Sequence, residues 1–334
     1  MIKGSRIAVG ALLFAALVSF ALEGRASEEG TKPLTALRPA SWDDLLRASC
    51  TVYLTNYPFG SGVLVGFDNP DAPPRTFLLT AAHVAEHVLQ HSTNVFRIAS
   101  VDDGGKNTTV FDVSIVQKRC AFFKYTDLCA IDITPDIVRY VKKGNEFLMK
   151  YISVNAGHLG EHSDEWWCGV VRYRDFRKHG IRLGTPCKWL GSNIWMWKRF
   201  ADANETSLCV FDGSIAALPR TTSRIKTTPP SPNGCPAFVT TIPAIHGMSG
   251  GPVFATGKTE DGLEYPYLIG IGVSQLFSDR IPLLQCTVRP SVMTNFVAFT
   301  NGVTVFAHTD NDKGSYVCPI DLFLDAIMNN KKGD

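Results

Sequence analysis

Only one apolar run of the sequence approaches the length that is needed to cross a membrane. The one candidate, Ile7–Leu22, has 16 residues, whereas a spanning helix usually needs about 20. Lys3 and Arg6 give this run a positive flank, and the small residues of Gly24-Arg25-Ala26 follow it. This order is typical of a cleaved secretory signal peptide, with an uncleaved signal anchor as the alternative. We therefore expect a signal peptide at residues 1–26, and a product that is secreted (or periplasmic in a bacterium) without stable membrane insertion.

An excess of charge of either sign is also absent. The chain has 33 basic and 31 acidic residues; the signal peptide holds three of these bases and one acid, which leaves 30 of each. A neutral chain argues against a general polyanion-binding surface, so we expect no nucleic-acid partner. One basic, aromatic run, residues 172–179, could bind phosphates, but in a neutral chain we interpret it as a solvated insertion loop.

The spacing of a structural zinc site is missing too, although the chain has nine cysteines. There is no Cys-x-x-Cys pair and no Cys/His cluster of the required spacing. After a signal peptide, disulfides are the expected state of cysteines, and an odd number leaves at least one thiol free or paired with another molecule. The pairing does not follow from the sequence. The cysteines are Cys50, Cys120, Cys129, Cys168, Cys187, Cys209, Cys235, Cys286 and Cys318.

Repeats and low-complexity tracts are absent as well, and short β-type segments fill most of the chain. Glycine, proline and asparagine separate these segments, which favours a barrel over a parallel sheet. Gly60-Ser61-Gly62 between two β-type segments predicts a hairpin turn, and Asn301-Gly302 predicts another. Ser41 followed by Asp44 has the pattern of a capping box and predicts a short helix.

These patterns divide the chain into consecutive parts. We expect an N-terminal arm with the short helix at 27–48, a first barrel at 49–145, and a second barrel with insertions at 146–318. Lys142–Asn145 is the candidate linker between the barrels. The apolar spacing after Pro319 suits a packed helix, so residues 319–334 are predicted to form a C-terminal helix and tail.

Three short motifs carry the chemistry. Gly247-Met248-Ser249-Gly250-Gly251-Pro252 puts an exposed hydroxyl on a tight turn, where backbone N–H groups can converge on a substrate oxygen. Far upstream, Thr80-Ala81-Ala82-His83 closes an apolar strand with a histidine that can act as base for this hydroxyl. Between them, Asp127 stands directly before an apolar strand. An acid, a base and a nucleophile are therefore all available.

In the chain order His83, Asp127, Ser249 the sequence resembles the chymotrypsin-like serine proteases. The resemblance implies an all-β fold of two six-stranded antiparallel β-barrels with a C-terminal helix. It also implies a secreted serine endopeptidase that cleaves protein or peptide substrates without a cofactor or metal. Ser249 would be the nucleophile, His83 the base and Asp127 the acid that orients it, while the N–H groups of Gly247 and Ser249 would form the oxyanion hole. Asp132, five positions after Asp127, is the second candidate for the acid.

The sequence departs from the digestive members of this family at two positions. Val84 replaces the cysteine that follows their histidine, and Met248 replaces the aspartate that binds the new N-terminus after activation. We therefore expect the signal-cleaved chain to be competent without a further cut. Other stretches, such as residues 240–243, are similar to HtrA-type and related bacterial or viral proteases.

The resemblance also implies a substrate pocket, with Pro243, Val273, Ser274 and Gln275 as its candidate residues. No acidic residue lies near the expected pocket floor. This composition argues against cleavage after arginine or lysine and favours a small or apolar side chain.

Other interpretations use the same residues. His83-x-x-Glu86-His87 spells a zinc-peptidase motif, in which two histidines one turn apart hold the metal. With the triad, His83 would instead start a single helical turn after its strand, and Glu86, His87 and His91 would be solvated. Gly247-x-Ser249-x-Gly251 also matches the nucleophile elbow of α/β-hydrolases, but glycine and proline follow where that fold needs a helix. A third possibility is a non-catalytic binding protein with a misaligned triad. The sequence does not determine the oligomeric state.

Overall fold

The structure of the chain is a computed structural model. It describes residues 38–54, 57–69, 72–91, 95–101, 107–154, 166–193, 208–222, 225, 227, 230–259, 262–275 and 314–330. The chain divides into two units, Met1–Arg38 and Pro39–Asp334, and the two large sheets belong to the second unit. The predicted signal peptide, the predicted turn at Asn301-Gly302, and Cys286 lie outside the described residues.

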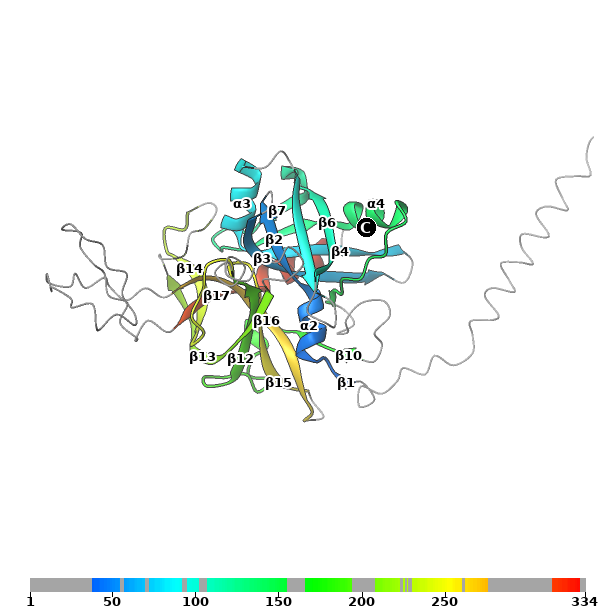
Figure 1. The fold of residues 1–334 in the computed structure, drawn as a ribbon. Coiled ribbons are helices and arrows are strands. Elements are labelled where there is room, and N and C mark those ends of the chain that lie inside the picture. Colours follow the sequence, from blue (N-terminus) through cyan, green and yellow to red (C-terminus); the bar gives the residue numbers. More distant parts are fainter. Residues whose placement is uncertain are drawn as a thin grey trace, which may run out of the picture. The chain divides into compact units, whose positions relative to one another are not determined.

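The first half of this unit forms one eight-stranded sheet. Its strands are β2 (Ser49–Leu54), β3 (Tyr57–Asn69), β4 (Ala72–Thr80), β5 (Val95–Val101), β6 (Asn107–Ser114), β7 (Cys120–Phe122), β8 (Cys129–Asp132) and β9 (Ile152–Ser153). Their order is β6-β5-β2-β3-β4-β8-β7, with β9 added in parallel to β3. Neighbours along this path are antiparallel, and Figure 1 shows them in blue to green, with helices α3 (Ala82–His91) and α4 (Thr134–Lys142) beside them. The path does not return to its first strand, so this sheet is an open half-barrel.

The second half forms a closed barrel. Its strands are β11 (Gly169–Val170), β12 (Pro186–Ser192), β13 (Leu208–Thr222), β14 (Cys235–Thr240), β15 (Pro252–Lys258), β16 (Glu264–Gln275) and β17 (Ser315–Pro319). The order is β11-β16-β15-β12-β13-β14-β17, and β17 pairs back onto β16. This last pairing closes a barrel of six antiparallel strands. The predicted all-β fold with two barrel-like sheets is thereby confirmed.

Short elements complete the unit. They are β1 (Arg38–Pro39), α2 (Trp42–Ala48), the 3₁₀ turns η2 (Gln117–Arg119) and η3 (Tyr173–Asp175), β10 (Trp166–Trp167) and α6 (Asp321–Asn330). The capping box at α2 is confirmed: the Asp44 N–H donates to Ser41 Oγ at 3.2 Å, and the Ser41 N–H donates to the Asp44 carboxylate at 3.0 Å.

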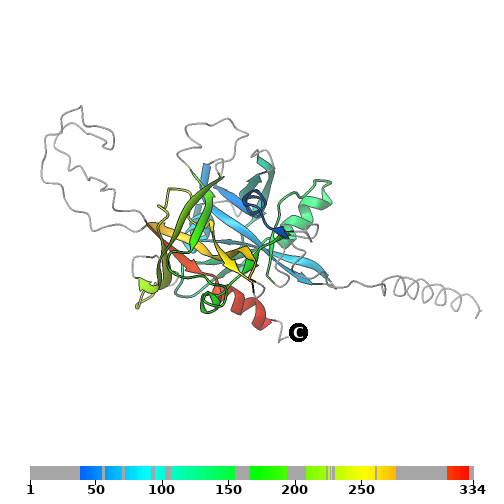
Figure 2. The same cartoon turned by 90° about the horizontal axis from the view of Figure 1, so that it is seen from below.

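The C-terminal helix α6, red in Figure 2, is also confirmed. Its Phe323 ring makes edge contacts with Phe77 and Phe123 of the first sheet, at centroid distances of 5.8 and 6.2 Å. The end of the chain therefore packs against the half-barrel with which the unit began.

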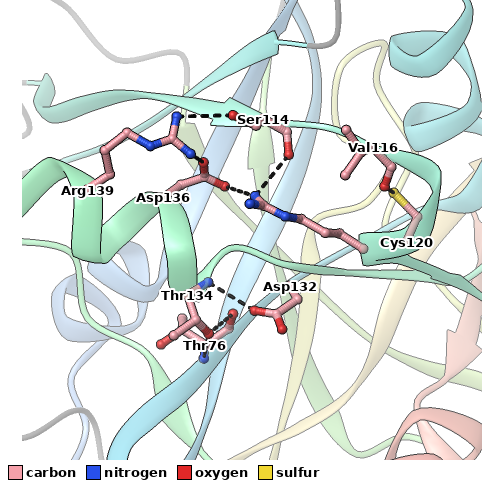
Figure 3. Close-up of polar contacts among 9 residues, drawn as sticks. Thr76, Ser114, Val116, Cys120, Asp132, Thr134, Asp136 and Arg139 are labelled. Atoms are coloured by element: carbon pink, nitrogen blue, oxygen red, sulfur yellow. Dashed lines mark hydrogen bonds and ion pairs between the residues drawn. The ribbon is translucent and has the colours of Figure 1, made fainter.

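Helix α4 was not predicted. It lies directly before the predicted linker at Lys142–Asn145, and its carboxylate Asp136 is buried between two arginines (Figure 3). Arg119 and Arg139 each donate to Asp136 at 2.8 Å. Ile137 and Tyr140 of the same helix pack against the core, at the apolar spacing that is typical of an amphipathic helix.

The predicted hairpin turn at Gly60-Ser61-Gly62 is wrong. These residues lie inside the continuous strand β3, and the strand pairing turns instead between Leu54 and Tyr57. The glycines are needed for close packing: a Cβ at Gly60 would come within 2.8 Å of Val84 and 3.2 Å of the Ser249 carbonyl oxygen.

The basic run at 172–179 is not a solvated loop throughout. Phe176 is buried and makes an edge contact with Phe238 at 5.8 Å. Arg172 forms an ion pair with Asp325 of α6, and the Tyr173 N–H donates to Asp321 at 3.0 Å. The start of this run is therefore anchored to the C-terminal helix through Arg172 and Tyr173, and Phe176 packs on β14.

No disulfide joins any of the eight cysteines among the described residues. Burial raises the pKa of Cys50 and Cys168 well above the ordinary value, so these two behave as inert core residues. The Sγ atoms of Cys235 and Cys318 lie 3.6 Å apart. Of the helices in the described ranges, none combines the length and apolar character of a membrane span.

Candidate active site

His83 and Asp127 are in contact. His83 is the second residue of α3, which begins two residues after β4 ends. Its Nδ1 lies 2.6 Å from Asp127 Oδ2, and its backbone N–H donates to Asp127 Oδ1 at 2.9 Å. The Asp127 carbonyl oxygen also accepts the N–H of Ala82 at 3.2 Å. Asp127 therefore caps the start of α3 while it holds the His83 ring.

A tight turn presents Asp127. The turn joins β7 to β8 and includes Tyr125, whose positive φ of 61° is unusual for a non-glycine residue. The N–H and Oγ1 of Thr126 both donate to the Phe123 carbonyl, at 3.1 and 2.9 Å. These bonds leave the Asp127 carboxylate pointing at His83 with only 2% of the residue exposed.

The contact with Asp127 determines the tautomer of the neutral His83 ring, that is, which ring nitrogen carries the hydrogen. An ionised carboxylate only accepts hydrogen bonds, so the Nδ1 that faces it must donate. In the neutral ring, Nε2 is then the nitrogen that can accept a proton. The His83 side chain keeps 30% of its surface exposed, so this nitrogen can be reached by a substrate or another side chain.

Asp132, the second candidate for the acid, is engaged elsewhere. It lies at the end of β8, where its carboxylate pairs with Arg75 at 3.2 Å. The carboxylate also accepts the Thr134 N–H at 3.1 Å, as Figure 3 shows. The structure brings Asp127, and not Asp132, to His83.

Ser249 lies on the loop between β14 and β15. Its Oγ is 3.4 Å from the carbonyl oxygen of Val273 on β16, a long hydrogen bond at most. The next residue, Gly250, has φ +91°, and a Cβ there would come within 2.2 Å of Ser61 O and Thr80 Oγ1. Only glycine therefore lets the serine loop approach β3 and β4 this closely.

The backbone N–H groups of this loop fall into two sets. Three of them have acceptors within the fold: Met248 donates to Ile245 O at 3.0 Å, Gly250 to Gly272 O at 2.8 Å and Gly251 to Met248 O at 2.9 Å. Those of Gly247 and Ser249 have no acceptor among the described residues. These two are the groups that were predicted to form the oxyanion hole.

Two of the four candidate pocket residues, Pro243 and Val273, have described side chains. Pro243 is exposed and lies three positions after the end of β14, and Val273 is buried in β16. Ser274 and Gln275 form the end of β16, where they pair with Tyr316 and Ser315 of β17; their side chains lie outside the described atoms. The pocket assignment therefore stays a prediction.

The histidines of the zinc motif have other neighbours. Helix α3 extends through His91, so the predicted single helical turn is too short. The His87 ring stacks on Phe59 at a centroid distance of 4.2 Å and lies 4.3 Å from the His91 ring. Partial burial, and then the nearby His91 and His83, lower the pKa of His87. Nowhere in the described part of the chain do three metal-binding side chains come together, so the geometry does not support a zinc centre at His83, Glu86 and His87.

Sequence reasoning missed one residue of the site. Ser61, interpreted as part of a turn, contacts the Ser249 loop from β3 through its backbone N–H and its hydroxyl. In the sequence, Ser61 stands out only as a polar residue between two glycines. Its partner loop lies 186 residues away, so the contact does not follow from the local pattern.

Comparisons with known proteins give distant structural similarities. No protein-family model matches the sequence, and no curated protein sequence matches it. Among solved structures, the MamO protease domain from Magnetospirillum magneticum is 11% identical with a TM-score of 0.42, covering 86% of this chain and 98% of its own. Mouse neuropsin, a serine protease, is 11% identical with a TM-score of 0.42, covering 88% and 98%. Human heparin binding protein is 12% identical with a TM-score of 0.40, covering 87% and 94%.

Proposed function

We propose that this chain, with its chymotrypsin-like two-barrel fold, is a serine endopeptidase that cleaves protein or peptide substrates through an acyl-enzyme. The observation that carries the proposal is the backbone of the Ser249 loop. From Gly247 to Gly251, only the N–H groups of Gly247 and Ser249 lack an acceptor in the described part of the chain. A pair of preorganised donors beside a serine hydroxyl is what an acyl-transfer site needs to stabilise an oxyanion.

The proposed reaction uses three side chains. Ser249 Oγ attacks the substrate carbonyl carbon while His83 Nε2 takes the hydroxyl proton. Asp127, paired with Nδ1 at 2.6 Å, stabilises the imidazolium that forms. The oxyanion binds to the N–H groups of Gly247 and Ser249. His83 then gives its proton to the leaving amine, and the same steps with water release the acid product and restore Ser249.

We also propose that the signal-cleaved chain is active without a further cleavage at its N-terminus. Met248, which replaces the aspartate of the digestive proteases, is fully buried. Its Sδ accepts the Ile245 N–H at 3.3 Å, and its own N–H donates back to Ile245 O at 3.0 Å. This loop is therefore closed by its own residues, which supports activity without a salt bridge from a new N-terminus.

Two further parts of the proposal come from the sequence. The signal-peptide pattern supports a secreted or periplasmic protein, in which cysteine pairs would be oxidised. The absence of an acid near Pro243 supports cleavage after small or apolar residues. No cofactor is needed for this chemistry.

The experiment is labelling of the purified, signal-cleaved protein with a fluorophosphonate, which reacts with activated serines. We expect labelling that a chelator does not affect and that Ser249→Ala abolishes, with the N-terminus sequenced to show that no further cut occurred. Peptide cleavage that a chelator abolishes, without labelling, would favour the zinc interpretation. Neither labelling nor cleavage would favour a binding protein on this fold.

A further inference from the structure

We propose that Ser61 is a positioning residue that holds the oxyanion hole in shape, an inference that rests on the proposed function. Ser61 belongs to β3 of the half-barrel, whereas the serine loop belongs to the closed barrel. It is fully buried. Its backbone and its side chain both bond to the loop, so one residue ties the nucleophile of one barrel to a strand of the other.

Four hydrogen bonds fix Ser61. Its Oγ donates to Gly247 O at 2.7 Å and accepts the Ser192 N–H at 2.7 Å. Its N–H donates to Ser249 O at 2.8 Å, and its carbonyl accepts Thr80 Oγ1 at 2.7 Å. A hydroxyl has one proton, and the Ser192 N–H can only donate. The Ser61 proton must therefore point at Gly247.

The two acceptors on the loop are the carbonyls of Gly247 and Ser249, the same residues whose N–H groups would bind the oxyanion. Gly247 has φ +97°, and as a glycine it meets little steric resistance to other backbone angles. The peptide between Gly247 and Met248 is held at both ends, by Ser61 Oγ at its oxygen and by Ile245 O at its N–H. Loss of the Ser61 contact would release one end of this peptide beside a glycine, whose backbone can take up other angles.

Preorganisation is what gives an oxyanion hole its effect, since donors that must first reorient stabilise the transition state less. Ser61 touches no reacting atom, so its contribution is expected to be smaller than that of a donor itself. Removing one donor from an oxyanion hole costs about 10²–10³ in kcat. We expect removal of the Ser61 hydroxyl to lower kcat by roughly 10- to 100-fold.

The experiment compares Ser61→Ala and Ser61→Cys with a matched control, Ser100→Ala. Ser100 is also a fully buried serine of the half-barrel, and its Oγ lies 3.0 Å from Arg47 O and 3.3 Å from Leu46 O, away from the loop. The cysteine variant keeps the volume of the site nearly unchanged while weakening the donor. Each protein is measured for kcat and KM on a peptide substrate, for its rate of fluorophosphonate labelling, and for its melting temperature.

Both Ser61 variants should lose kcat and labelling rate together while KM is unchanged, and amide exchange at Met248 should become faster. Ser100→Ala should lower the melting temperature without changing kcat. Equal rates in wild type and Ser61→Ala would overturn the role of Ser61 and leave the proposed function standing. An equal loss of kcat in the Ser61 and Ser100 variants would also overturn it, because general destabilisation would explain both. An inert wild-type protein would instead overturn the proposed function, and this inference with it.

Discussion

At the scale of single residues, the site depends on polar groups that each serve two purposes. Asp127 caps α3 through its carbonyl and one carboxylate oxygen, and it pairs with the His83 ring through the other. Ser61 likewise uses its hydroxyl both to donate to the serine loop and to accept from Ser192. Such dual use fixes side-chain geometry tightly, because any movement breaks two bonds at once.

Asp127→Asn should lower kcat by about four orders of magnitude, as expected when the group that orients a catalytic histidine favours the wrong tautomer. Steady-state kinetics on a peptide substrate would measure this. The matched control is Asp132→Asn, which removes the partner of the exposed Arg75 and should leave kcat nearly unchanged. The reverse result would transfer the role of the acid to Asp132.

At the scale of secondary-structure elements, α4 is held by an ion network. Asp136 has no exposed side-chain surface and pairs with both Arg119 and Arg139, and both arginines also reach Ser114 on β6. Figure 3 shows Arg139 and Asp136 side by side over this strand. The helix is therefore attached to the half-barrel by charge and hydrogen bonds as well as by apolar contacts, since Ile137 and Tyr140 pack against the core and the Tyr140 ring lies 5.5 Å from that of Phe111.

Asp136→Ala should destabilise the protein by about 3 kcal/mol, because it leaves the partly buried Arg119 without its carboxylate. Urea unfolding would measure the change in the free energy of unfolding. Asp112→Ala is the matched control: its pair with Arg97 spans 3.2 Å between side chains that are 44% and 61% exposed, and such pairs contribute about 0–1 kcal/mol. A similar loss in both variants would contradict the buried network.

At the scale of the whole unit, the two barrels meet around Asp127. The Cys235 and Cys318 thiols belong to β14 and β17 of the closed barrel, and Asp127 belongs to the half-barrel. The hydrogen bond from Cys318 is the main cause that lowers the pKa of Cys235, and the backbone of Asp127 lowers it further. This thiol pair therefore lies next to Asp127.

Under oxidising conditions Cys235 and Cys318 should form a disulfide. Their Sγ atoms are 3.6 Å apart, and the more acidic Cys235 is the better attacking thiolate. The two thiols would form the protein disulfide by exchange with an added disulfide such as oxidised glutathione, which takes up the two protons and two electrons and leaves as two glutathione thiols. Peptide mapping without reduction, after alkylation of the remaining thiols, should recover these two cysteines linked, and Cys50 and Cys168 alkylated separately. Recovery of Cys235 and Cys318 as separate alkylated peptides would contradict the prediction.

The sequence by itself determined the β-rich architecture, the helix at Ser41, the terminal helix, and the residue types of the site. These follow from local patterns: alternation and turn residues, a capping box, helical apolar spacing, and glycines around a serine. It did not determine the role of Gly60-Ser61-Gly62, the presence of α4, or the choice between Asp127 and Asp132.

Only the tertiary structure decided those points, because each depends on a partner far away in the chain. Gly60 is explained by Val84 and Ser249, and Gly62 by Leu78. The attachment of α4 through Asp136 depends on Arg119. The choice of acid depends on the ring of His83, which Asp127 reaches at 2.6 Å while Asp132 pairs with Arg75. Local sequence fixes which groups a residue offers, and the fold fixes which groups it meets.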